Sequence, residues 1–219
     1  METKMKTELI IFDLDGTILN TLEDLADSTN YALVANQLPQ RTMEEVRSFV
    51  GNGIKKLIDR AVPEGCKDTI VDKVFADFKE HYEKHCADKT RPYDGILELL
   101  GELQNKKYHL AVVSNKADFA VQELCETYFS GKFEYVVGER KGIRRKPYPD
   151  SVLEVLDKLQ INKENAVYVG DSEVDIETAK NAGIKMICVE WGFRDRAYLM
   201  EQGAENFAAS PIEIYRFLD

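Results

Sequence analysis

The chain has few of the features that mark secreted or membrane proteins. It contains only four cysteines in 219 residues, and no two are close in sequence: Cys66, Cys86, Cys125 and Cys188. This spacing indicates neither a disulfide framework nor a zinc site. No long uncharged apolar run occurs, and residues 1–6 lack a signal-peptide pattern. We therefore expect a cytoplasmic protein with reduced thiols and no membrane span.

The chain also has fewer basic than acidic residues. Lys and Arg total 29 against 39 Asp and Glu, which gives a formal net charge of -10. This balance argues against non-specific binding to nucleic acid and against docking on an anionic membrane. It also repels phosphorylated ligands, so an anionic substrate needs a metal ion or a few well-placed cations.

The hydrophobic pattern divides the chain into a helical stretch and an alternating one. Residues 19–89 show only helical periodicity, whereas predicted helices and strands alternate from residue 93 onward. Alternation favours α/β architecture, with a doubly wound, Rossmann-like parallel sheet covered by helices on both faces. Because an apolar strand precedes the helical stretch, we expect residues 1–18 plus 90–219 to form the core and 19–89 an inserted all-helical domain.

The predicted elements are short and regularly spaced. Helices are expected over 22–33, 43–50, 54–61 and 70–82 in the insert and over 96–103, 119–128, 150–159 and 174–182 in the core, with strands over 10–13, 110–113, 135–137, 166–169 and 186–189.

Two aspartates follow the first apolar strand. The run from Leu9 to Phe12 stops at Asp13-Leu14-Asp15-Gly16. Ligands of open parallel sheets bind outside the carboxyl ends of the strands, so these carboxylates stand where chemistry is expected. Taken alone, the motif is explained equally well by a strand that ends in an Asx-rich turn.

Polar groups close two further predicted strands. The strand 166–169 runs into Gly170-Asp171, with Asp175 shortly after, and the strand 110–113 ends in Ser114-Asn115. Lys146 stands on a polar loop between them. Each has an ordinary structural explanation: a helix N-cap for Ser114, solvated surface for Lys146, and a favourable helix-dipole contact for Asp175. Their order along the chain instead favours one shared site.

Four such elements in this order resemble the motifs of the haloacid dehalogenase superfamily of phosphotransferases. These motifs are Asp-x-Asp-x-Thr, a Ser/Thr that closes a strand, a loop Lys, and Gly-Asp-x-x-x-Asp. The matching residues are Asp13, Asp15 and Thr17, then Ser114, then Lys146, then Gly170, Asp171 and Asp175. A helical insert directly after the first motif resembles members that carry it as a mobile cap. Within that group, segments 49–53, 146–150 and 190–193 are similar to phosphoglycolate phosphatases.

The resemblance implies a phosphomonoester hydrolase that acts through an aspartyl phosphate. Asp13 would be the nucleophile, and Asp15 the acid for the leaving oxygen and then the base for water. Acids that converge in this way need a hard cation, and Mg²⁺ is the metal expected. By resemblance, the side chains of Asp13 and Asp171 and the backbone carbonyl of Asp15 bind it. Asp175 either supports these ligands or occasionally binds the metal.

The resemblance also implies how the phosphate is bound. Ser114, Lys146 and the backbone N–H of Asn115 would hold its non-bridging oxygens. We interpret the basic run Arg140–Lys146 as a cationic approach for anionic substrates.

The expected substrate is phosphoglycolate or a similar small acidic phosphate, and the protein is expected to be a monomer or homodimer. Nucleotidase, pyrophosphatase and β-phosphoglucomutase-like activities remain alternatives. The β-phosphoglucomutases carry a cap histidine at the position where this chain has Leu25, and this difference argues against that alternative. A catalytically silent binding protein with this fold is the non-enzymatic alternative, but it predicts a missing catalytic group and none is missing.

Overall fold

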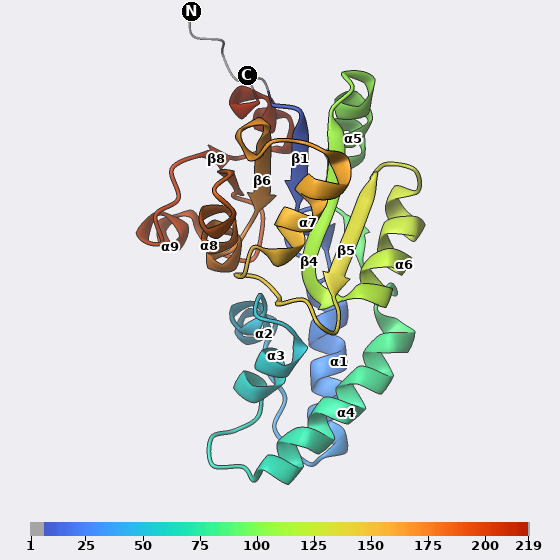
Figure 1. Cartoon of the computed structure of the whole chain (residues 1–219). Helices are drawn as coiled ribbons and strands as arrows, with labels where there is room; N and C mark the ends of the chain where they lie inside the picture. Colours follow the sequence, from blue (N-terminus) through green and yellow to red (C-terminus); the bar gives the residue numbers. More distant parts are fainter. Residues whose placement is uncertain (1–6, 219) are drawn as a thin grey trace, which may run out of the picture. The chain divides into compact units, whose positions relative to one another are not determined.

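The computed structural model describes residues 7–218, so residues 1–6, on which the expected lack of a targeting segment partly rests, lie outside the described part. The chain divides into two compact units (Figure 1). One is built from residues up to Ile18 and from Pro92 onward, and the other is Leu19–Arg91. Cys66, Cys86, Cys125 and Cys188 are free thiols in this structure. Over residues 7–218, none of the helices has the length and apolar character that crossing a membrane would require.

The first unit contains the parallel sheet that the sequence predicts. Its strands run in the order β5-β4-β1-β6-β7-β8, and every registered pair is parallel. Their bounds are β1 (Leu9–Phe12), β4 (His109–Ala117), β5 (Tyr135–Glu139), β6 (Ala166–Gly170), β7 (Lys185–Val189) and β8 (Phe207–Ala208). From β1 the chain builds first toward β4 and β5 and later toward β6, β7 and β8. The order therefore reverses beside β1, the position at which open α/β sheets bind ligands.

Helices cover both faces of this sheet. They are α5 (Ile96–Asn105), α6 (Asp118–Phe129), α7 (Asp150–Leu159), α8 (Glu173–Ala182) and α9 (Arg196–Glu201), with 3-10 turns η1 (Lys163–Asn165) and η2 (Pro211–Phe217). Leu9 and Ile11 pack into a core cluster that includes residues of α7 and α8, which lie in front of the sheet in Figure 1. Phe12 alternates to the opposite face and contacts Phe133, which in turn contacts Phe129 of α6. This double covering explains why β1 is apolar throughout.

Within the first unit, the structure differs from the predicted elements at the end of β4 and after residue 190. β4 continues to Ala117, four residues beyond the predicted end, with a register irregularity between Val113 and Ala117. Because α6 begins at Asp118, Ser114 lies within the strand and is not a helix N-cap. The elements after residue 190 were not predicted, since α9 and β8 are too short to show a clear period.

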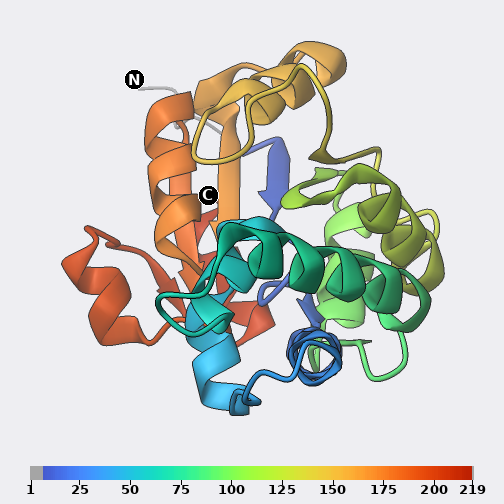
Figure 2. The same cartoon turned by 90° about the horizontal axis from the view of Figure 1, so that it is seen from below.

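The second unit consists mainly of helices. They are α1 (Leu22–Ala35), α2 (Met43–Phe49), α3 (Ile54–Ala61) and α4 (Asp68–His85). α1 packs against α4 and is seen end-on beside it in Figure 2. The expected apolar face of α4 is buried through Val74, Phe78 and Tyr82. The unit is not purely helical, because β2 (Leu19–Asn20) pairs with β3 (Arg91–Pro92); a strand of two residues carries no periodic signal.

Asp24 fixes the returning chain within the second unit. Its buried carboxylate accepts the backbone N–H of Lys89 at 3.0 and 3.1 Å and that of Thr90 at 2.8 Å. Asp27 instead binds the Lys89 ammonium at 2.6 Å on the exposed surface. Asp24→Ala should lower the free energy of unfolding by about 2 kcal/mol, because it leaves buried donors unpaired. Asp27→Ala should cost less than about 1 kcal/mol. Urea titrations of both variants test this, and equal losses would contradict it.

Candidate active site

The predicted acids meet at the carboxyl ends of β1 and β6. These strands are neighbours, with Phe12 aligned to Val169, so Asp13 and Asp171 emerge at the same edge of the sheet. Oxygens from the carboxylates of Asp13, Asp171 and Asp175 all lie within 4.8 Å of one another. All three side chains belong to buried residues. The structure therefore brings together acids that are up to 162 positions apart in the sequence.

Small residues allow this close approach. Gly16 has a φ of 82°, and a Cβ at this position would collide with the carboxylate of Asp171. A Cβ on Gly170 would lie 2.5 Å from the Cβ of Asp175. Asp171 itself is oriented by the backbone N–H of Phe193 at 2.7 Å and by the Thr17 hydroxyl at 3.3 Å. The glycines of the motifs are thus required by packing around the carboxylates.

Lys146 is buried among the acids and is not solvated surface. Its ammonium lies 2.9 Å from Oδ1 of Asp13, 2.7 Å from Oδ1 of Asp175 and 3.1 Å from the hydroxyl of Tyr168. Burial opposes its charge, but Asp13 and Asp175 outweigh that effect and raise the pKa of Lys146 well above its usual value. The side chain of Asn115 donates to the Lys146 carbonyl at 3.1 Å and anchors the loop. Lys146 is therefore held as a cation directly beside Asp13.

The carboxylates carry more negative charge than Lys146 balances. Burial raises the pKa of Asp13 to about 7, with Lys146 lowering it and Asp175 raising it. Burial, together with Asp175 and Asp13, raises the pKa of Asp171 well above its usual value. A bound cation would reverse both effects. The donor set is oxygen only and anionic, which suits a hard divalent ion such as Mg²⁺.

Both oxygens of Asp175 already bind protein groups. Oδ1 accepts from Lys146, and Oδ2 accepts from the backbone N–H of Asp171 at 3.2 Å and of Ser172 at 3.1 Å. The Ser172 hydroxyl also donates to Oδ2 at 2.6 Å. These contacts tie Lys146 to the loop that carries Asp171, so Asp175 organises the site.

The two predicted phosphate-binding residues on β4 lie at the same edge of the sheet. β4 is the neighbour of β1 on the side opposite β6, and Ser114 and Asn115 are both buried. The Ser114 hydroxyl accepts the backbone N–H of Lys116 at 3.2 Å.

Lys116 is a site residue that the sequence analysis missed. Its ammonium lies 2.9 Å from Oδ1 and 3.2 Å from Oδ2 of Asp15, and its side chain is only 3% exposed. Two lysines therefore lie beside the acids, and the sequence analysis identified only Lys146. The available signal was the position of Lys116 directly after the strand-ending pair Ser114-Asn115, but a lysine after a strand is usually solvated.

The basic run before Lys146 is largely neutralised by carboxylates. Its arginines form the ion pairs Arg140–Glu154, Arg144–Asp150 at 2.8 Å and Arg145–Glu139 at 3.9 Å. These partners offset the positive charge that we expected to guide anionic substrates. The sequence pattern did not reveal them, because Glu154 and Asp150 come from the following helix.

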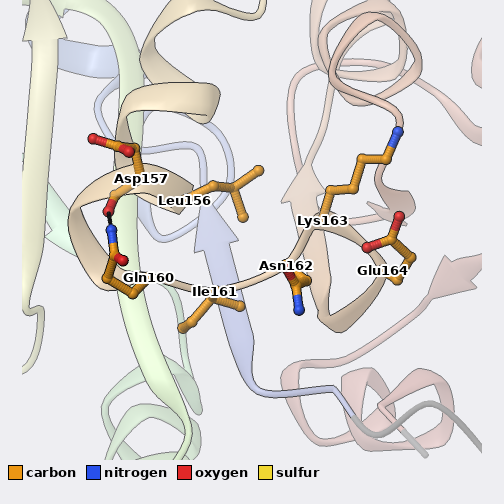
Figure 3. Close-up of a pocket in the computed structure, with 7 residues that line it drawn as sticks. All are labelled: Leu156, Asp157, Gln160, Ile161, Asn162, Lys163 and Glu164. Atoms are coloured by element: carbon orange, nitrogen blue, oxygen red, sulfur yellow. Dashed lines mark hydrogen bonds between the residues drawn. The ribbon is translucent and has the colours of Figure 1, made fainter.

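A hollow lies away from the acids. It is lined by Leu156, Asp157, Gln160, Ile161, Asn162, Lys163 and Glu164 (Figure 3). These residues precede β6, so the hollow is at the amino edge of the sheet, opposite the edge that carries the acids. Its charged groups do not converge, since Asp157 and Lys163 point away from each other (Figure 3). The clustered acids therefore lie at the carboxyl edge, away from this hollow.

Known proteins resemble this chain over nearly its whole length. The sequence model of the family described as haloacid dehalogenase-like hydrolase matches residues 10–189. A phosphoglycolate phosphatase of Mesorhizobium japonicum is 34% identical over 196 residues, which cover 88% of this chain and 86% of that protein. An N-acetylmuramic acid 6-phosphate phosphatase of Pseudomonas aeruginosa is 30% identical over 99% of this chain and 96% of that protein. A crystal structure from Lactobacillus delbrueckii subsp. bulgaricus, described as a candidate phosphoglycolate phosphatase, superposes with a TM-score of 0.93 at 37% identity, covering 98% of this chain and 99% of that one.

Proposed function

The chain belongs to the haloacid dehalogenase-like hydrolases and is a phosphatase, and from this premise we propose that it hydrolyses phosphoglycolate through an aspartyl phosphate formed on Asp13, with Mg²⁺ bound. The observation that carries the proposal is the placement of Asp13. Its carboxylate ends the central strand and contacts Lys146 inside the acid cluster. A nucleophile, a cation for phosphate and acids for metal binding thus share one small volume.

The residues divide the reaction between them. Asp13 attacks phosphorus and the bond to the leaving oxygen breaks, so the phosphoryl group is transferred to its carboxylate. Asp15, two residues further along, gives a proton to the leaving oxygen. The same carboxylate then takes a proton from the water that hydrolyses the aspartyl phosphate. Ser114, Lys146 and the backbone N–H of Asn115 hold the phosphoryl oxygens throughout.

The donor set fits a resident Mg²⁺. The side chains of Asp13 and Asp171 and the carbonyl of Asp15 would hold the ion. When bound, it supplies positive charge to the phosphoryl oxygens. The contacts of both Asp175 oxygens favour a supporting role for that residue over direct metal binding. We further propose that Leu19–Arg91, inserted directly after the first acids, serves as the cap of this family.

Magnesium should stabilise the protein through Asp171. A ligand present at a hundred times its dissociation constant adds about 2.7 kcal/mol to the free energy of unfolding, which should appear as a clear rise in Tm. Asp171→Asn should lose this rise, whereas Asp157→Asn, at the far edge of the sheet, should keep it. Chelator should abolish hydrolysis and added Mg²⁺ should restore it. Full activity in excess chelator, or an undiminished rise in Asp171→Asn, would reject the metal site.

A panel of substrates tests the choice of phosphoglycolate. It is supported by the relatives that carry that name, while the Pseudomonas aeruginosa relative makes N-acetylmuramic acid 6-phosphate the second candidate. Values of kcat/KM with Mg²⁺ should be compared for these two, a nucleoside monophosphate, pyrophosphate and β-glucose 1-phosphate. Phosphoglycolate should rank first. A higher value for any other member would replace it while leaving the phosphatase chemistry intact.

A further inference from the structure

Lys116 places a second cation on the leaving-group side of the site. The ammonium of Lys146 is occupied with Asp13, the proposed nucleophile, and with Asp175. The ammonium of Lys116 instead contacts both oxygens of Asp15, the proposed acid for the leaving oxygen. The two lysines therefore serve different ends of the bond that breaks. Lys146 lies beside the proposed nucleophile, and Lys116 lies beside the proposed acid for the leaving group.

The position of Lys116 is fixed by the core of the first unit. It lies near the end of β4, beyond the residues that pair with β1, and its backbone N–H donates to the Ser114 hydroxyl. Its side chain is 3% exposed and that of Asp15 is 15% exposed, so the pair is screened from bulk water. Burying an ammonium is costly unless anions compensate for it. Asp15 supplies one such anion, and a substrate carboxylate would be a second acceptor for the same ammonium.

An ammonium here can hold two carboxylates at once. It carries three N–H donors, and Lys146 demonstrates the arrangement by binding Asp13 at 2.9 Å and Asp175 at 2.7 Å. A carboxylate that reaches Lys116 while Asp15 addresses the ester oxygen must be attached close to that oxygen. In the phosphate ester of an α-hydroxy acid, a single carbon separates the ester oxygen from the carboxylate.

We propose that Lys116 is a specificity-determining residue that binds a substrate carboxylate one carbon away from the ester oxygen. The substrate class is then the phosphate esters of α-hydroxy acids, of which phosphoglycolate is the smallest. This inference rests on the proposed function, because it takes Asp15 as the acid. It disfavours N-acetylmuramic acid 6-phosphate, whose carboxylate lies on a different part of the sugar from its phosphate.

Three probes and three variants test the proposal. The probes are phosphoglycolate, 3-phosphooxypropanoate, which has one more methylene, and ethyl phosphate, which has no carboxylate. Lys116→Met should reduce the ratio of kcat/KM for phosphoglycolate to that for ethyl phosphate by roughly ten- to a hundredfold, the worth of a hydrogen bond to a charged group. The loss should appear mainly in KM. Lys116→Arg should retain more of the ratio, and Lys163→Met, at the far edge of the sheet, all of it.

The ratio separates specificity from catalysis. Lys116→Met also removes a partner of Asp15, and that effect is common to both substrates and cancels. An unchanged ratio would overturn the proposal and reduce Lys116 to a residue that positions Asp15, with the phosphatase function intact. If the wild type hydrolysed no phosphate ester, the proposed function would fail and this inference with it.

The wild-type protein provides a test that does not depend on any variant folding. It should prefer phosphoglycolate over 3-phosphooxypropanoate by at least roughly tenfold in kcat/KM, because the longer acid carries its carboxylate past Lys116. Equal values of kcat/KM for the two acids would overturn the assignment. This result could be obtained even if circular dichroism showed that Lys116→Met is unfolded.

Discussion

Asp13→Asn should lower kcat for every phosphate ester by roughly a thousandfold or more, because an amide cannot attack phosphorus as a carboxylate does. Asparagine keeps the shape of the side chain in a site where Asp13 is buried against Lys146 and close to Asp175. Packing should therefore survive while nucleophilicity is lost. Steady-state rates with phosphoglycolate and with p-nitrophenyl phosphate measure the effect. The loss should be the same for both, since the nucleophile is common to them.

Binding of a mimic of the aspartyl phosphate tests the role of Asp13 independently of the rate of hydrolysis. Beryllium fluoride, which mimics an aspartyl phosphate, should bind the wild type and raise its Tm in the presence of Mg²⁺. It should have no such effect on Asp13→Asn. The matched control is Asp157→Asn, which makes the same chemical change at the opposite edge of the sheet and should behave as wild type. Turnover by Asp13→Asn at a near wild-type rate would place the nucleophile elsewhere.

Asp15→Asn should separate substrates by their leaving groups. A positioned acid contributes roughly a hundred- to ten-thousandfold, and an alkoxide needs its proton whereas a nitrophenolate leaves without it. Transfer of phosphate to Asp13 should therefore slow by that factor with phosphoglycolate and far less with p-nitrophenyl phosphate. The substitution leaves the backbone carbonyl of residue 15 in place, so the proposed metal ligand is kept.

The second half-reaction gives an independent sign of the same role. Without a base to activate water, Asp15→Asn should release one equivalent of nitrophenol in a burst and then stall. Single-turnover and burst measurements in a stopped-flow instrument decide the matter. Equal slowing of both substrates with no burst would make Asp15 a residue that positions the site and not its acid and base.

The sequence was sufficient to predict the parallel sheet and the edge at which its acids gather. β1 is apolar at every position because helices cover both of its faces, and this run needs no distant partner to be recognised. Acids and polar groups that directly follow parallel strands must share one edge of the sheet. Asp13, Ser114 and Asp171 could therefore be placed at one edge of the sheet from their positions after predicted strands.

Tertiary structure alone decided which charges neutralise one another. Lys116 and Asp15 are 101 positions apart, and their contact depends on the extra length of β4, whose irregular end the local pattern does not encode. The contact between Lys146 and Asp175, 29 positions apart, likewise depends on the fold. Hydrophobic periodicity reports which face of an element is buried, whereas the direction of a long lysine side chain depends on the anions that folding brings near it.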